Sequence, residues 1–140
     1  MVLKDNSSPN KLKGNTWLVI GKNNNEIFEQ ELFSFFGNNK SGDYILNTSF
    51  LEKNENILVK NNQVAEKINY ELIIEYTIFF KNKSCNIYKK KLTTKFSFLP
   101  KSFGYNFGAD RSLEKLYKNS VRKNMQDFIN SIPTENICLK

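Results

Sequence analysis

Lysines at alternating positions are the side chains in this sequence with the clearest capacity for binding chemistry. Lys89, Lys91 and Lys95 share one phase of an apolar-rich run, and Lys90 sits between them. A lysine ammonium binds phosphate as a point charge. We therefore take Lys89, Lys91 and Lys95 as candidate contacts for a phosphate-bearing ligand. A solvated face that serves only solubility is the alternative interpretation.

The overall charge also favours an anionic partner. The 140-residue chain carries 21 Lys and Arg against 14 Asp and Glu, a net charge of +7. Nucleic acid, an acidic membrane surface and a phosphorylated glycolipid all fit this balance. A nucleic-acid interface would favour more arginine and exposed aromatics among the charges. The only arginines are Arg111 and Arg122, and the aromatics fall mainly in apolar phases, so nucleic acid is the less favoured partner.

The residue types needed for most catalysis are missing. The sequence has no histidine, which excludes histidine-based acid–base chemistry and histidine metal ligation. Cys85 and Cys138 fit no metal-binding spacing; they could form a disulfide in an oxidising compartment or remain thiols. Glu71 and Glu75 are interpreted as cross-strand charge partners rather than a catalytic pair. We expect a protein that is not an enzyme and holds no cofactor or metal.

The candidate lysines lie on one arm of a predicted β-hairpin. Residues 67–80 alternate between apolar and polar side chains, which is typical of a strand with one buried face. A polar turn at 81–84 leads into a second extended run, 87–99, which carries the lysines. Such a hairpin is only marginally stable alone, so other elements must cover its apolar face.

The remaining elements can supply that cover. Apolar side chains on both faces of 15–20 predict an inner strand, and 26–36 has helical spacing after possible asparagine caps. Residues 44–51 form another predicted strand, and 57–59 either extend it or form a short additional strand. The period changes to about 3.6 over 110–132, which predicts an amphipathic helix. Asp110 or Ser112 could cap this helix, Pro133 ends it, and its apolar stripe comprises Leu113, Leu116, Tyr117, Val121, Met125, Phe128, Ile129 and Ile132.

This order predicts an α+β fold, a two-layer sandwich with a mostly antiparallel sheet and two helices packed on one face (β-α-β-β-β-α). We expect a flexible leader at 1–14, a single domain at 15–133 and a tail at 134–140. No apolar run approaches the roughly 20 residues of a membrane span, and Met1–Pro9 lacks the apolar core of a signal peptide. The chain is expected to be cytosolic, or to be a fragment whose export signal has been removed.

The pattern as a whole resembles the lipopolysaccharide-assembly lipoprotein family LptE, in its alphaproteobacterial form. The likeness runs over residues 15–132. It includes the strand Trp17-Leu-Val-Ile20 before a helix, the run from Asn69 to Phe80 similar to the family's Y-x-L strand, and Lys91-Leu-Thr-Thr-Lys-Phe-Ser-Phe98. Gly104-Tyr105-Asn106 is similar to a Ser-Tyr-Asn-like segment of the family.

The resemblance implies a plug inside an LptD-like outer-membrane barrel that acts in lipopolysaccharide transport at the periplasmic face of the outer membrane. The family's lipidated N-terminal cysteine is absent here, which leaves compartment and anchoring open. Under this hypothesis Lys89, Lys91 and Lys95 contact the phosphates of lipopolysaccharide. Two alternatives stay open: a basic nucleic-acid-binding module of a phage or mobile element, and a purely structural assembly subunit.

Overall fold

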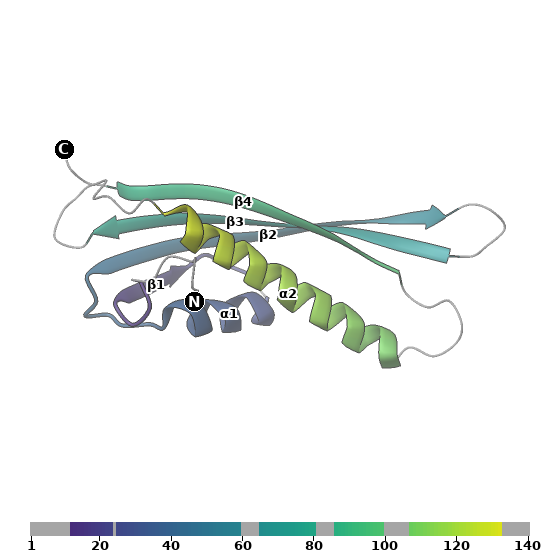
Figure 1. The fold of residues 1–140 in the computed structure, drawn as a ribbon, viewed down its shortest axis with the longest axis horizontal. Helices are drawn as coiled ribbons and strands as arrows, with labels where there is room; N and C mark the ends of the chain where they lie inside the picture. Colours follow the sequence, from purple (N-terminus) through teal and green to yellow (C-terminus); the bar gives the residue numbers. More distant parts are fainter. Residues whose placement is uncertain (1–11, 24, 60–64, 81–85, 100–106, 133–140) are drawn as a thin grey trace, which may run out of the picture.

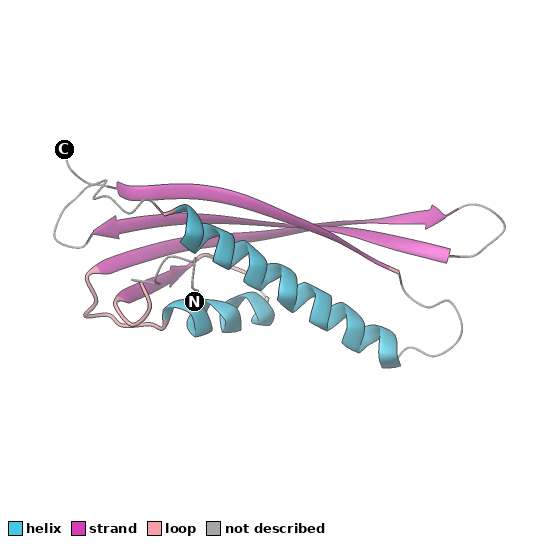
Figure 2. Ribbon diagram, viewed as in Figure 1, coloured by secondary structure: helices cyan, strands magenta, loops and turns pink. Residues whose placement is uncertain are grey.

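The protein is a two-layer α+β domain, as the sequence predicted. The computed structural model describes residues 12–23, 25–59, 65–80, 86–99 and 107–132. Four strands form one sheet and both helices pack on the same face of it (Figure 2). In chain order the elements are β1 (Thr16–Ile20), α1 (Glu26–Phe36), β2 (Tyr44–Val59), β3 (Ala65–Phe80), β4 (Asn86–Phe98) and α2 (Phe107–Ser131).

The sheet has the strand order β1-β2-β3-β4, with β2, β3 and β4 antiparallel and β1 parallel to β2. The prediction that β1 is an inner strand is wrong, because β1 lies at one edge of this order. After β1 the chain passes through α1 and returns as β2, which pairs with only one edge of β1. Its apolar side chains divide accordingly, since Leu18 is buried beneath the helices whereas Val19 on the other face is 41% exposed.

β2 is much longer than β1 and continues through a polar stretch. Its register with β3 is unbroken from Tyr44 opposite Phe80 to Val59 opposite Ala65. Of the two possibilities for residues 57–59, extension of the strand is therefore the correct one. The β2–β3 hairpin consequently extends well beyond β1 and α1 (Figure 1).

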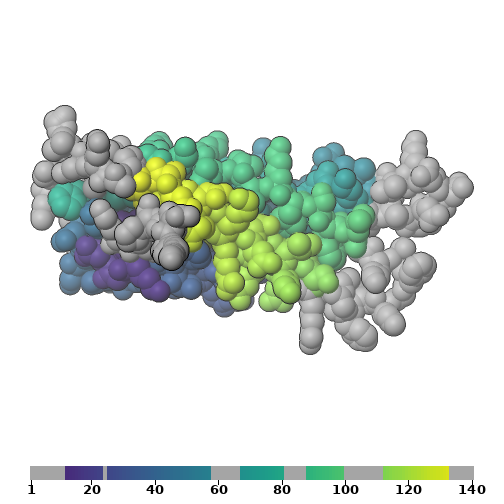
Figure 3. All heavy atoms as spheres, viewed as in Figure 1, coloured from purple at the N-terminus to yellow at the C-terminus, as the bar shows by residue number. Residues whose placement is uncertain are grey.

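The core lies between the sheet and the two helices. The rings of Tyr76 from β3 and Phe128 from α2 stack with centroids 3.9 Å apart, and neither side chain is exposed. Phe28 and Phe36 of α1 are also fully buried. Burying such a side chain stabilises the fold by roughly 1.5–3 kcal/mol. In Figure 3 the yellow-green α2 forms a band across the visible face, between the green β4 and the blue α1.

The ends of α1 follow the capping signals in the sequence. The Asn25 side chain accepts a hydrogen bond from the Phe28 N–H at 2.8 Å, which satisfies one of the free donors of the first turn. At the other end Gly37 has a φ of 70° and donates its N–H to the Phe33 carbonyl. Glycine adopts this left-handed conformation without steric cost, so it ends the helix there.

The long helix α2 begins at Phe107, earlier than expected. Asp110 and Ser112 therefore lie inside the helix, and the prediction that one of them caps it is wrong. Most of the predicted stripe faces the core, but Leu116 is 38% exposed and does not belong to the buried face. Within the described residues no helix is both long and apolar enough to cross a membrane.

Some expectations fall on residues outside the described ranges. These include the 81–84 turn, Cys85, Cys138 and the Gly104-Tyr105-Asn106 segment. Leu12 lies within the range expected to be a flexible leader, yet its side chain is buried. Its carbonyl accepts a hydrogen bond from the Thr16 hydroxyl at 2.7 Å, which joins it to the start of β1.

Candidate functional site

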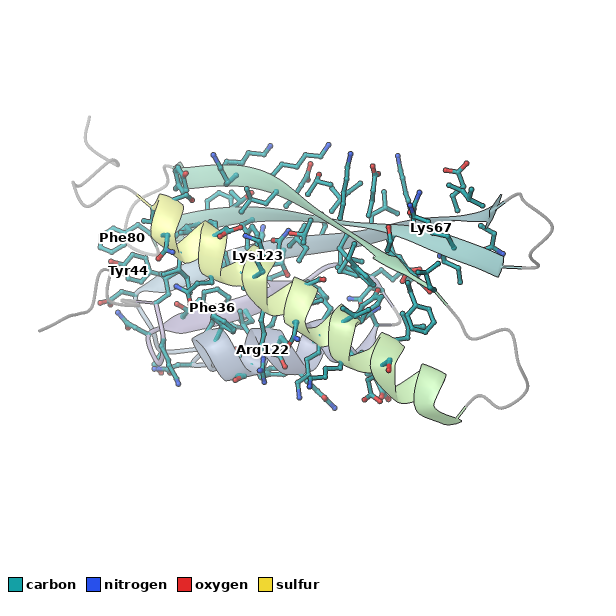
Figure 4. The ribbon with its side chains drawn as sticks, turned by 45° about the vertical axis from the view of Figure 1, so that its right-hand side comes forward. Phe36, Tyr44, Lys67, Phe80, Arg122 and Lys123 are labelled. Atoms are coloured by element: carbon teal, nitrogen blue, oxygen red, sulfur yellow. The ribbon has the colours of Figure 1, made fainter. Side chains whose placement is uncertain are left out.

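The sheet face that the helices leave uncovered carries the lysines singled out from the sequence. In β4, Tyr88 and Leu92 pack against the core, whereas Lys89, Lys91 and Lys95 are exposed on the opposite face. Every second residue of a strand lies about 7 Å further along it, so these three lysines span about 20 Å. Figure 4 shows a row of nitrogen-tipped side chains on this side of the sheet. We call Lys89, Lys91 and Lys95 the β4 lysine strip.

Acidic residues of β3 lie opposite two of the three lysines. Lys95 is the strand partner of Glu71, with Nζ 3.5 Å from a carboxylate oxygen, and Lys91 is the partner of Glu75. Lys89 lies opposite an uncharged threonine. The Lys95 and Glu71 side chains are 71% and 37% exposed, and such pairs contribute about 0.2–1 kcal/mol. A phosphate could therefore replace the carboxylate at small cost, and Lys89 is the lysine of the strip with no acid directly opposite.

The strand register reveals a fourth lysine that sequence reasoning missed. Lys53 of β2 is the partner of Glu71, so this carboxylate lies between Lys53 and Lys95. The surface here is a shallow hollow lined by residues 53–55, 69–71 and 95–97 of three neighbouring strands. Residues 52–56 are polar throughout, so their pattern alone assigns Lys53 to neither face of the sheet. Continuing the β2–β3 pairing past Leu51 would have placed Lys53 on the lysine face.

The charge of the uncovered face is moderately positive. Among its described strand residues, five lysines stand against three glutamates, a net charge of +2. The lysines are Lys53, Lys67, Lys89, Lys91 and Lys95, and the glutamates are Glu55, Glu71 and Glu75. Since three of the five lysines belong to β4, the positive charge is concentrated along that edge strand.

The basic residues of α2 form a separate group on the helix side of the molecule. Arg122 Nε lies 3.0 Å from a carboxylate oxygen of Glu31, which is buried in α1. Lys123 pairs with Asp127 one turn further along the helix. Figure 4 shows Arg122 and Lys123 on α2, away from the sheet face that bears the lysine strip. The structure therefore does not combine the helix cations and the strip into one site.

Buried polar contacts fix α2 against the inner face of the sheet. Asn124, fully buried, accepts a hydrogen bond from the Tyr76 hydroxyl at 2.6 Å and donates to the Leu92 carbonyl and the Thr94 hydroxyl, both at 3.0 Å. These contacts join one helix residue to β3 and β4 together. Burial raises the pKa of the Tyr76 hydroxyl well above its ordinary value, with a smaller contribution from the charge of Asp127.

A second polar cluster lies where α1, α2 and β2 meet. The Tyr117 hydroxyl donates to a carboxylate oxygen of Glu52 at 2.6 Å and accepts from the Asn25 amide at 2.7 Å. Burial, followed by the hydrogen bond to Glu52, strongly raises the pKa of the Tyr117 hydroxyl. Tyr117 therefore stays neutral and acts as a fixed connection between helix and strand. Both clusters connect the helices to the inner face of the sheet, opposite the β4 lysine strip.

Comparisons with known proteins identify the fold but no sequence family. No protein-family profile matches the chain, and neither does any curated protein sequence. Among solved structures, a putative lipoprotein from Caulobacter crescentus matches with a TM-score of 0.57 at 8% identity, covering 84% of this chain and 88% of that one. A minor lipoprotein from Acinetobacter baumannii matches with the same TM-score and the same coverage at 13% identity.

A third solved structure is the rare lipoprotein B from Shewanella oneidensis. It matches with a TM-score of 0.50 at 14% identity and covers 81% of this chain and 89% of that one. At such low identities these likenesses concern the fold alone. The chain thus shares its architecture with bacterial lipoproteins.

Proposed function

We propose that the protein is a non-enzymatic subunit of lipopolysaccharide transport and assembly at the periplasmic face of the outer membrane. The sequence resembles the LptE family, and the fold is shared with bacterial lipoproteins, rare lipoprotein B among them. The observation that carries the proposal is the exposed β4 lysine strip, which lies on the sheet face opposite the two helices of the described residues.

The same face combines charge with apolar surface, which suits an amphiphilic ligand. Leu51 of β2 is 52% exposed and lies opposite Ile73 of β3, one row away from the Glu71–Lys95 pair. Lysine ammonium groups would meet the phosphates of the inner sugars of lipopolysaccharide, and the apolar row would contact its hydrocarbon. The wall of an LptD-like barrel would enclose the domain and limit the access of water to these contacts.

Charge reversal of the strip tests this function. We expect the Lys89→Glu/Lys91→Glu/Lys95→Glu variant to bind lipopolysaccharide at least tenfold more weakly than the unmodified chain in a fluorescence titration. Three exposed charge contacts at about 0.5 kcal/mol each give roughly 1.5 kcal/mol, which corresponds to about tenfold. Binding of the unmodified chain should weaken as salt is raised, because exposed charges are screened.

The matched control is Lys22→Glu/Lys115→Glu/Lys118→Glu. These three lysines are also exposed but lie outside the uncovered sheet face, and the net charge changes by the same amount. The control should bind as the unmodified chain does. Equal losses in both triple variants would contradict a specific strip.

Saturable binding to nucleic acid at about 0.15 M salt, without lipopolysaccharide binding, would favour the nucleic-acid alternative. A stable complex with a barrel, without either ligand, would favour the purely structural one.

A further inference from the structure

The outer half of β2 has an open edge. Five of its sixteen residues, Tyr44–Thr48, pair with β1, which leaves the eleven residues from Ser49 to Val59 with no strand on that side in the described part of the chain. Figure 1 shows this half of β2 continuing past the end of β1, on the edge of the sheet remote from α2. An open edge offers unpaired N–H and C=O groups as a template for another strand.

Hydrogen bonds in the paired half show which residues face that edge. The Thr48 carbonyl points toward β1 and accepts from the Gly21 N–H at 2.8 Å. Because backbone directions alternate along a strand, the even-numbered residues Glu52, Asn54 and Asn56 direct both their N–H and C=O groups toward the open edge. Residues 53–56 are all exposed.

The sequence along this edge is complementary to itself when it is read in the antiparallel direction. Residues 51–57 read Leu-Glu-Lys-Asn-Glu-Asn-Ile, with Asn54 at the centre. Two copies paired about Asn54 place Lys53 of each copy opposite Glu55 of the other, and Leu51 opposite Ile57. Opposite charges and apolar pairs at facing positions both stabilise antiparallel strands.

We propose that two copies of this chain, when no barrel encloses them, associate through the open edge of β2, antiparallel and centred on Asn54. In this register Glu52 lies opposite Asn56 and Asn54 opposite Asn54, so the residues that direct N–H and C=O outward form the hydrogen-bonded pairs. Three such pairs would form about six backbone hydrogen bonds between the copies. The two sheets join into one, and their lysine faces lie on the same side.

Charge selects this register over its neighbours. Moving the centre by one residue toward Lys53 places two lysines opposite each other, and moving it toward Glu55 places two glutamates opposite each other. Like charges at facing positions destabilise a strand pair. Of these three registers, the one centred on Asn54 is thus the one that places each Lys53 opposite a Glu55 of the other copy.

The test is sedimentation of the full chain and its variants over a range of concentrations. We expect a dimer for the unmodified chain. Lys53→Glu should raise the dissociation constant by at least about tenfold, because two attractive pairs become repulsive, and Glu55→Lys should do the same. The matched controls are Lys115→Glu and Glu114→Lys on the exposed face of α2, which should leave the dissociation constant unchanged.

A mixture of the two charge variants gives the decisive result. A chain with Lys53→Glu presents two acids to the two lysines of a chain with Glu55→Lys, so the mixture should form heterodimers with an affinity near that of the unmodified protein. Asn54→Pro removes an N–H that points away from β3, so it should also abolish the dimer while preserving the fold by circular dichroism. A monomer at about 100 μM, which means a dissociation constant weaker than that concentration, a dimer insensitive to Lys53→Glu, or no rescue on mixing would each overturn the proposal. None of these assays contains lipopolysaccharide, so their outcome is independent of the proposed function.

Discussion

Asn124 offers a sharp test of how the sheet is held behind its uncovered face. Its side chain is fully buried and makes three hydrogen bonds, with the Tyr76 hydroxyl, the Leu92 carbonyl and the Thr94 hydroxyl. Asn124→Ala removes all three and leaves the buried Tyr76 hydroxyl and two half-buried groups, the Leu92 carbonyl and the Thr94 hydroxyl, without these hydrogen bonds. Each buried group left unsatisfied costs about 1–3 kcal/mol, so we expect the free energy of unfolding to fall by about 3 kcal/mol or more.

Tyr76→Phe separates one of these contacts from the others. It keeps the ring that stacks on Phe128 at 3.9 Å and removes only the hydroxyl, so a loss of about 1–2 kcal/mol is expected. In the double variant Tyr76→Phe/Asn124→Ala the Tyr76 hydroxyl is absent, so it is not left buried without a partner. The double variant should therefore lose about 1–2 kcal/mol less than the sum of the two single changes.

Urea unfolding followed by circular dichroism and by tryptophan fluorescence measures these differences. Asn119→Ala is the matched control, since Asn119 is exposed on the same helix. It should change the free energy of unfolding by less than about 0.5 kcal/mol. A loss below about 1 kcal/mol for Asn124→Ala, or strict additivity of the double variant, would refute the account of a buried polar contact that joins α2 to two strands.

Three further predictions concern other contacts. Arg122→Ala leaves the Glu31 carboxylate buried without its ion pair, and urea unfolding should show a loss of roughly 1–2 kcal/mol; no loss would contradict that contact. Because the pKa of Tyr117 is raised in the fold, its stabilising contribution is complete below pH 10, the ordinary tyrosine value, and declines as pH rises above it. In an ultraviolet titration, Tyr117 should ionise only when the protein unfolds at high pH. The Tyr117→Phe variant should lack this one ionisation step. Gly42→Ala would place a methyl group against the backbone of Asn15, and a reduced melting temperature is expected, whereas unchanged stability would contradict the close approach.

The sequence was most informative where the spacing of apolar residues and the capping residues indicate the same element. The alternation in β3 and the spacing in α1 predicted those elements correctly, and Asn25 and Gly37 mark the ends of α1 as expected. A one-sided apolar pattern reflects burial directly, and it therefore predicts both helices on the same face of the sheet. The position of Lys89, Lys91 and Lys95 on the opposite face follows from the same alternation.

The sequence was less informative where pairing between distant segments decides the position of a strand or a side chain. The apolar residues on both faces of β1 predict an inner strand, but apolar residues also occur on exposed faces, and β1 lies at an edge. Residues 52–56 carry no apolar alternation, so the continuation of β2 and the position of Lys53 depend on pairing with β3. The Glu31–Arg122 contact joins two helices far apart in sequence, and no local pattern predicts it.

Lysine footprinting tests the central claim most directly. Acetylation of each exposed lysine, quantified by mass spectrometry with and without lipopolysaccharide, reports which ammonium groups the ligand covers. We expect Lys89, Lys91 and Lys95 to lose reactivity on addition of lipopolysaccharide, while Lys115 and Lys118 keep theirs. Protection of the two helix lysines with an unprotected β4 lysine strip would contradict the account.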